Sequence, residues 1–216
     1  MRDAIDDLYR AYAPVPLDPD VDFCAHCVTS EQVAALHAAP LREIPAKTIG
    51  RLLAKGITTW GDERYFRHFI PRLLELTVAG ELNAFSVEVY LPRKLAGCLA
   101  AGPADEQAAV DRFLAAWWTD TLARYPTPVD AATVHKMITT TGRPGTPLLA
   151  AWPGAQPWHL AMFVAEHAQG DPPAEIAAWL GGGVPAALLT AAGNTTDDLE
   201  LLEQISWALE LVAHNY

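Results

Sequence analysis

Apolar residues recur with a helical period along most of the chain. Between residues 2 and 13 they stand at positions i, i+3, i+4 and i+7, which lie on one face of an α-helix: Ile5, Leu8, Tyr9 and Tyr12. Proline and glycine separate this segment from others that have the same period. The pattern predicts about ten helices, at 2–13, 30–39, 45–56, 63–80, 86–101, 103–125, 129–138, 158–168, 173–180 and 197–214, with short ones at 147–152 and after 185.

The pattern contains no convincing β-strand. Only residues 85–90 alternate between apolar and polar, and this stretch is short and has no second strand to pair with. Helices joined by short Pro/Gly turns favour antiparallel helical hairpins, either as an irregular α-solenoid-like array or as a compact bundle. No repeat of fixed period is present, so a regular solenoid class is not supported. The length of 216 residues fits a single all-helical domain, 1–216.

Local signals predict how several helices begin. Thr29 and Gln32 have the spacing of a capping box at the start of the second helix. Thr195 or Thr196 is predicted to cap the last helix. Pro71 lies inside the fourth helical pattern and is expected to kink or split it, because proline lacks the amide N–H and its ring crowds the preceding turn. The aromatic side chains of this pattern are predicted to be buried next to the proline: Tyr65, Phe66 and Phe69.

The chain is acidic. Its 15 Lys and Arg residues are outnumbered by 26 Asp and Glu residues, which gives a formal net charge of -11. A field of that sign repels nucleic acid and anionic membranes and attracts basic proteins. We therefore predict a basic protein partner, with neither nucleic-acid nor membrane binding. Acidic residues gather toward both ends of the chain, and the predicted protein-binding residues are Asp3, Asp6, Asp7, Asp197, Asp198 and Glu200.

Targeting signals are not recognisable. The opening MRDAIDDLYR lacks the basic start and apolar run of a signal peptide. No stretch approaches the run of about eighteen apolar residues that predicts a transmembrane helix. Three cysteines are too few for a disulfide scaffold. We therefore expect a cytoplasmic protein.

The segment from Cys24 to Cys27 has the spacing of a zinc knuckle, in which two thiolates on a tight turn bind one metal ion. A structural zinc takes four ligands and there is no second Cys-x-x-Cys, so His37, His68 or Cys98 would have to complete the site. The alternative is two small, partly buried cysteines at a helix–loop junction. A redox role is disfavoured, since a thioredoxin-like pair requires a strand-to-helix context.

Four polar residues share a second face of the helix predicted at 63–80, namely Arg64, His68, Arg72 and Glu75. As a functional site they would bind an anion or carboxylate, with His68 as an acid or base. The alternative, which we favour, is a solvated or interhelical face in which Arg72 pairs with Glu75. No Ser/His/Asp or Cys/His arrangement is recognisable, so no catalytic residue is predicted.

The block Trp60-Gly61-Asp62, followed by FRHFIPRLLEL from Phe66, resembles a bacterial family of uncharacterised proteins. That family shares a "TWGD…FRHFLPRLLEL" block with a Cys-x-x-Cys segment upstream, and Ile70 replaces the usual Leu. The resemblance covers residues 23–76 and fades toward the C-terminus. It implies kinship, and because the family has no established activity it implies no chemistry.

Two functions compete on this basis. The first is a non-catalytic protein-interaction module that presents an acidic surface to a basic partner, for example an immunity or inhibitor protein that neutralises a toxin or enzyme. The second is a zinc-binding protein in which Cys24 and Cys27 hold a structural or hydrolytic zinc. The first is favoured, because the net charge is -11 and only half of a metal motif is present.

Overall fold

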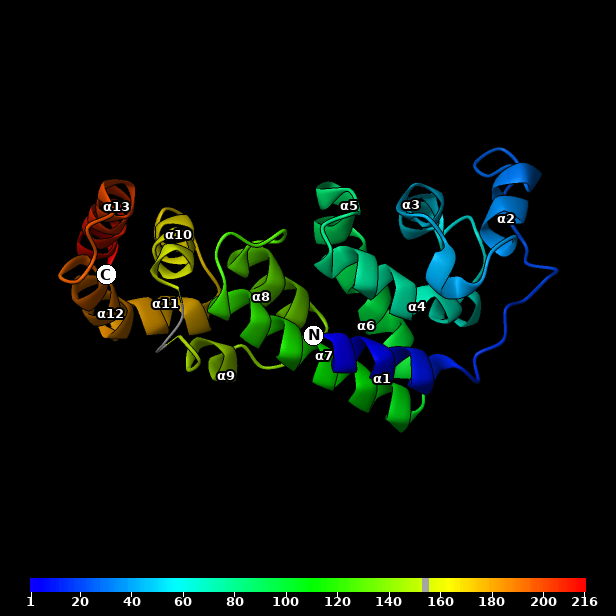
Figure 1. Ribbon diagram of the computed structural model, residues 1–216, viewed down its shortest axis with the longest axis horizontal. Coiled ribbons are helices and arrows are strands. Elements are labelled where there is room, and N and C mark those ends of the chain that lie inside the picture. Colours follow the sequence, from blue (N-terminus) through cyan, green and yellow to red (C-terminus); the bar gives the residue numbers. More distant parts are fainter. Residues whose placement is uncertain (153–155) are drawn as a thin grey trace. The chain divides into compact units, whose positions relative to one another are not determined.

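The computed structural model describes residues 1–152 and 156–216. Within these two ranges the chain forms α-helices α1 to α13 and one 3-10 helix, and no β-strand beyond isolated bridges at Phe23–Trp60 and Gly56–Trp60 (Figure 1). The all-helical prediction is confirmed, and residues 85–90, which alternate, are largely helical rather than extended.

The described residues group into two compact units, whereas the sequence led us to expect a single domain. Unit 1 comprises residues 1–117 and 136–143, and unit 2 comprises residues 118–135 and 144–216. Two of the boundaries fall inside helices, where no linker or change of composition marks them in the sequence.

Unit 1 is organised around helix α4. Its elements are α1 (Arg2–Tyr12), α2 (Ser30–His37), the 3-10 helix η1 (Leu41–Glu43), α3 (Ala46–Lys55), α4 (Glu63–Val78), α5 (Ala84–Val89), α6 (Leu91–Ala101), the first part of α7 (Ala104–Ala123) and the last part of α8 (Ala131–Thr140). Helix α4 packs against α1, α3, α6 and η1. Its apolar side chains from Tyr65 to Leu76 are buried and form the core of the unit.

Helix α4 runs without a break through Pro71, so the proline does not split it. Asp62 caps the helix by accepting the N–H of Tyr65 at 2.8 Å. Phe66 and Phe69 are fully buried beside Pro71, as expected. Burial of two such aromatic side chains contributes more than the roughly 3 kcal/mol that an internal proline costs a helix, which is why the helix continues.

Two predicted helix boundaries in unit 1 have different outcomes. The capping box is present: Thr29 accepts the N–H of Gln32 at 3.4 Å, and Gln32 accepts the N–H of Thr29 at 3.0 Å. The single helix expected at 86–101 is instead two helices, α5 and α6, which meet at Tyr90. The reason is Pro92, because it has no N–H to donate to the carbonyl one turn earlier.

Unit 2 is organised around helix α10. Its elements are the last part of α7, the first part of α8, α9 (Thr146–Leu149), α10 (Pro157–Ala168), α11 (Ala174–Gly181), α12 (Val184–Gly193) and α13 (Leu199–Asn215). Helix α10 packs against α11, α12 and most extensively α13, which lies beside it (Figure 1). Helix α12 is longer than the one or two turns expected, and it follows Gly183, whose φ of 76° suits glycine.

The last helix begins later than predicted. Its cap is Asp198, whose Oδ1 accepts the N–H groups of Glu200 and Leu201, both at 3.1 Å. Thr195 instead donates its hydroxyl to carbonyls at the end of α12. The carboxylate is the stronger acceptor for a helix start, because it carries a full negative charge at the positive end of the helix.

Among the described residues, no single helix combines the length and the apolar composition that crossing a membrane requires. Helices α11 and α12 meet those criteria only when taken together, with a bend of 55° between them.

Candidate protein-binding site

The N-terminal acidic cluster is matched by arginines of its own unit. Asp6 lies 2.5 Å from Arg42, and that hydrogen bond lowers the pKa of the Asp6 carboxyl group. Asp7 pairs with Arg10 at 2.5 Å and lies 3.5 Å from Arg112. Two of the three carboxylates predicted to bind a partner therefore have intramolecular partners, and the third, Asp3, is exposed in the first turn of α1.

The C-terminal acidic cluster has no such partners. Asp197, Asp198 and Glu200 are exposed, and no ion pair in the described part of the chain involves any of them. Besides capping α13, Asp198 accepts the indole N–H of Trp158 through Oδ2 at 3.3 Å. Leu199 follows it and is 74% exposed. This cluster combines negative charge with exposed apolar surface.

The polar face of α4 is not one site. Arg72 donates to the carbonyl of Ile44 at 2.9 Å and to Glu75 at 2.6 Å. Glu75 also accepts the hydroxyl of Tyr9 at 2.7 Å. These contacts hold α1 and the end of η1 against α4, so the interhelical interpretation with its Arg72–Glu75 pair is confirmed for this part of the face.

The other two residues of that face lie elsewhere. His68 has Nδ1 at 2.8 Å from the carbonyl oxygen of Val15, so Nδ1 carries a proton. Arg64 lines a separate polar hollow with Asp18 and Asp62. The structure therefore does not bring Arg64, His68 and the Arg72–Glu75 pair together around one ligand.

The predicted metal ligands are also dispersed. Cys24 is exposed, Cys27 is partly buried and Cys98 is buried, where its thiol donates to the carbonyl of Glu63 at 3.8 Å. His37 Nε2 lies 2.8 Å from the hydroxyl oxygen of Tyr65. Among the described residues, no group of three or more His, Cys, Asp or Glu side chains is placed to hold a metal ion.

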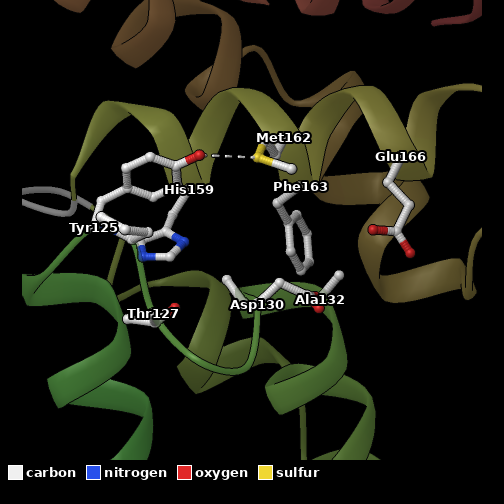
Figure 2. Close-up of a pocket in the computed structure, with 10 residues that line it drawn as sticks. Tyr125, Thr127, Asp130, Ala132, His159, Met162, Phe163 and Glu166 are labelled. Carbon is white, nitrogen blue, oxygen red and sulfur yellow. Dashed lines mark hydrogen bonds between the residues drawn. The ribbon is translucent and has the colours of Figure 1, made fainter. Parts of the chain in front are cut away.

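A pocket in unit 2 combines aromatic, apolar and acidic side chains. It has a volume of about 170 Å³ and lies between α10 and the segment that leads into α8 (Figure 2). Helix α10 contributes one wall, and the residues before and at the start of α8 contribute the other. It is called the α10 pocket, and six of its lining residues are Tyr125, Asp130, His159, Met162, Phe163 and Glu166.

The exposed rim of the α10 pocket is apolar. Tyr125 and Met162 are 40% and 45% exposed, and the Tyr125 hydroxyl donates to the Met162 sulfur at 3.7 Å (Figure 2). The Tyr125 ring stacks on Trp158, with centroids 5.3 Å apart and an interplanar angle of 5°. Aromatic and methionine side chains held in the open are typical of protein interfaces, since they adapt to a partner and bury a large area.

Histidine forms part of the inner wall in its neutral state. His159 is 3% exposed and its Nε2–H donates to the carbonyl of Arg124 at 2.6 Å. Burial lowers the pKa of His159, because the charged imidazolium loses its hydration. The ring contacts Tyr125 edge-on at 5.1 Å. His159 therefore packs against Tyr125, and because its ring is neutral it adds no positive charge to the pocket.

Two carboxylates supply the negative charge of the α10 pocket. Asp130 begins α8, where it accepts the N–H and hydroxyl of Thr133 at 2.7 and 2.9 Å. Glu166 is exposed on α10, one turn beyond Met162 (Figure 2). An apolar wall with aromatic faces and flanking carboxylates suits the stem and charged end of an arginine or lysine side chain.

A chain of contacts joins the α10 pocket to the C-terminal acidic cluster. Asp198 accepts the Trp158 indole N–H, Trp158 stacks on Tyr125, and Tyr125 donates to Met162. The acidic start of α13 and the pocket rim are therefore parts of one candidate surface. Its position was not predicted, because the sequence separates these residues by up to 73 positions.

Unit 2 is far more acidic than the whole chain suggests. It contains ten Asp and Glu residues and one basic residue, Arg124, which gives a formal charge of -9. Arg124 pairs with Asp120. The sequence does carry this signal, because no Lys or Arg occurs in residues 144–216. The net charge of the chain as a whole does not show that most of the acidic excess lies in unit 2.

Comparison with protein-family models, with curated proteins and with solved structures found no match to this chain.

Proposed function

We propose that this chain is a protein-binding module whose unit 2 docks a basic segment of a partner protein. An arginine or lysine side chain of the partner enters the α10 pocket, and neighbouring basic residues lie against the acidic start of α13. The observation that carries the proposal is the α10 pocket, with exposed Tyr125 and Met162 beside Asp130 and Glu166.

The size of the α10 pocket fits one side chain. A cavity of about 150 Å³ accommodates a benzene molecule, and this pocket has about 170 Å³. An arginine suits it best, because a planar guanidinium stacks on aromatic rings and pairs with carboxylates. Burying one such anchor within a polar rim is how small interfaces gain much of their affinity.

Unit 2 also has the charge that a basic partner requires. With a formal charge of -9, its field attracts cationic segments and accelerates their encounter. The field weakens with added salt, since charges are screened beyond about 8 Å at physiological ionic strength. Association with a basic partner should therefore slow as salt rises, with a smaller change in dissociation.

A methyl NMR titration tests the pocket directly. The chain has three methionines, of which Met162 lines the α10 pocket and Met137 is buried in unit 1. With ¹³C-methyl methionine, a blocked tri-arginine peptide should shift the Met162 signal saturably and leave Met137 unchanged. Glu166→Gln should weaken binding about threefold, the effect of one partly screened charge.

Two matched controls sharpen this titration. A tri-citrulline peptide has the shape of tri-arginine without its charge, so it should bind much more weakly. Glu81→Gln removes an exposed carboxylate from unit 1 and should leave binding unchanged. The proposal is wrong if Met162 does not respond to tri-arginine at millimolar concentration, or if tri-citrulline binds equally well.

A further inference from the structure

The segment from Cys24 to Cys27 is a tight turn anchored in unit 1. The N–H groups of Cys27 and Val28 both donate to the Cys24 carbonyl, at 2.8 and 3.0 Å. The Cys24 N–H donates to the carbonyl of Thr59 at 2.9 Å. A hydrogen-bonded turn holds its first and fourth Cα atoms within about 7 Å, and disulfides bridge Cα atoms about 4.4 to 6.8 Å apart. The turn therefore holds the Cα atoms of Cys24 and Cys27 at about the separation that a disulfide bridges.

The two thiols differ in access. Cys24 is exposed and Cys27 is partly buried, and both are free. In a dithiol that exchanges with disulfides, one thiol meets the substrate and the other attacks it from within. This difference in exposure gives each cysteine one of those two roles. Cys98, buried elsewhere in unit 1, provides an internal reference.

The turn also stabilises a thiolate at Cys24. The backbone N–H groups of His26 and Cys27, then the Cys27 thiol, lower the pKa of Cys24, and Lys55 adds to this. Such N–H groups normally come from a helix that follows a strand, which is why the sequence argued against a redox role. In this protein the turn itself supplies these N–H groups. Burial raises the pKa of Cys98 to about 12, so that thiol stays protonated.

Positive charge and a groove lie next to the turn. Arg51 donates to the carbonyl of Cys27 at 3.4 Å. Arg51 also lines a groove of about 650 Å³ between α2 and α3, together with Gln32, Lys47 and one acidic residue, Glu31. Arg51 belongs both to this groove and to the contacts of the turn, and two cationic side chains in the groove favour a substrate that carries carboxylates.

We propose that Cys24 and Cys27 form a thiol–disulfide exchange pair whose substrate is a small disulfide bearing carboxylates. The Cys24 thiolate attacks one sulfur of that disulfide, which forms a mixed disulfide and releases the first thiolate. The Cys27 sulfur then attacks Cys24 and releases the second. The protein dithiol loses two electrons and two protons, and the substrate disulfide gains them as two thiols. This chemistry belongs to unit 1 and is independent of binding by unit 2.

Glutathione disulfide, which carries several carboxylates, is the probe that tests the pair. The reduced full-length protein is incubated with it, quenched in acid and mapped by peptide mass spectrometry. The expected product has a Cys24–Cys27 disulfide and a reduced Cys98. In Cys27→Ser the reaction should stop at a mixed disulfide on Cys24. Cys24→Ser should react about tenfold more slowly, since a less stabilised thiol carries less thiolate at neutral pH.

Two further measurements separate charge from access and do not depend on the serine variants. Arg51→Ala should slow the reaction with glutathione disulfide about threefold and leave the reaction with uncharged hydroxyethyl disulfide unchanged. In the unaltered protein, iodoacetamide should modify Cys24 before Cys27 and Cys98 at pH 7. Mixed disulfides on both Cys24 and Cys27 without an internal bond, or equal alkylation of Cys24 and Cys27, would overturn the proposal.

Discussion

Unit 1 and unit 2 use charged residues in opposite ways. Unit 1 has sixteen acidic and fourteen basic residues, so its formal charge is -2, and many of these residues pair across helices. Unit 2 has ten acidic residues and one arginine. Opposite charges in unit 1 therefore meet within the unit, whereas the ten carboxylates of unit 2 have one basic residue to meet within theirs. The difference indicates which unit a basic partner would contact.

The two units also differ in what apolar surface they expose. Of the large apolar side chains that are exposed, Phe85 belongs to unit 1. The others belong to unit 2: Tyr125, Met162, Val184, Leu199, Trp207 and Tyr216. Exposed apolar side chains in a unit of net negative charge are more typical of a protein interface than of a solvated face.

The largest expected effect tests the structural use of charge in unit 1. Arg67 binds both carboxylate oxygens of Glu106, at 3.0 and 2.5 Å, and Glu106 is 4% exposed. Arg67→Ala leaves that carboxylate buried without its partner, so we expect the free energy of unfolding to fall by about 3 kcal/mol. Urea denaturation measures the loss.

A double variant checks the cause of that loss. Arg67→Ala combined with Glu106→Leu removes the buried charge as well, and it should recover a large part of the stability. Arg112→Ala, which removes an exposed arginine, should change stability by no more than about 0.5 kcal/mol. Equal effects of Arg67→Ala and Arg112→Ala would mean that burial of the pair does not matter.

The next effect comes from a buried histidine of unit 2. His135 is 3% exposed between the rings of Trp118 and Phe163, and burial lowers its pKa to about 4. The unfolded chain binds a proton near pH 6.5 and the folded chain does not. Stability is therefore complete above pH 6.5 and falls as pH drops toward 4. Between pH 7.5 and 5.5 we expect a loss of about 1 kcal/mol, measured by thermal or urea unfolding.

A non-titrating variant isolates the contribution of this histidine. His135→Gln should be less stable at pH 7.5 but should show a flatter pH dependence over the same interval. If the variant and the parent lose the same free energy on acidification, the protons are bound elsewhere and His135 is not the cause.

A smaller effect separates the two acidic clusters predicted from the sequence. The first variant neutralises the C-terminal cluster with Asp197→Asn, Asp198→Asn and Glu200→Gln. It should raise the Kd for the tri-arginine peptide about fivefold. Asparagine also caps helices, so α13 should stay intact.

The matched variant neutralises Asp3, Asp6 and Asp7 in unit 1 and should leave the Kd unchanged, because two of these carboxylates already have arginine partners. The Met162 methyl titration measures both variants. Equal weakening by the two sets would remove the distinction between the units.

The smallest effect concerns a single surface ion pair of unit 1. Asp6→Asn breaks the contact with Arg42, which is about half exposed. We expect the free energy of unfolding to change little, since exposed ion pairs are screened and contribute little. Because the folded-state pKa of Asp6 is lowered, the pair contributes above the ordinary Asp range and is lost as pH falls. A loss of several kcal/mol in urea denaturation would contradict this.

Local sequence determined the helices. Period, proline and capping signals predicted the all-helical fold, the capping box at Thr29 and the buried aromatic face of α4. They did so because a helix is built from bonds between residues three or four positions apart. Two predictions from these signals were wrong, because a neighbouring residue had the stronger effect. Pro92 ended a helix early, and Asp198 caps the last helix in place of Thr195 or Thr196.

Tertiary structure alone decided which polar residues have partners and which surround a pocket. Asp6 meets Arg42 over 36 positions and Arg67 meets Glu106 over 39, so no local pattern distinguishes these residues from Asp197 or Glu200. The α10 pocket likewise draws Tyr125 and Met162 together over 37 positions. Helices form from local hydrogen bonds and apolar period, but pairing and cavities depend on how helix faces meet, which is set by long-range packing.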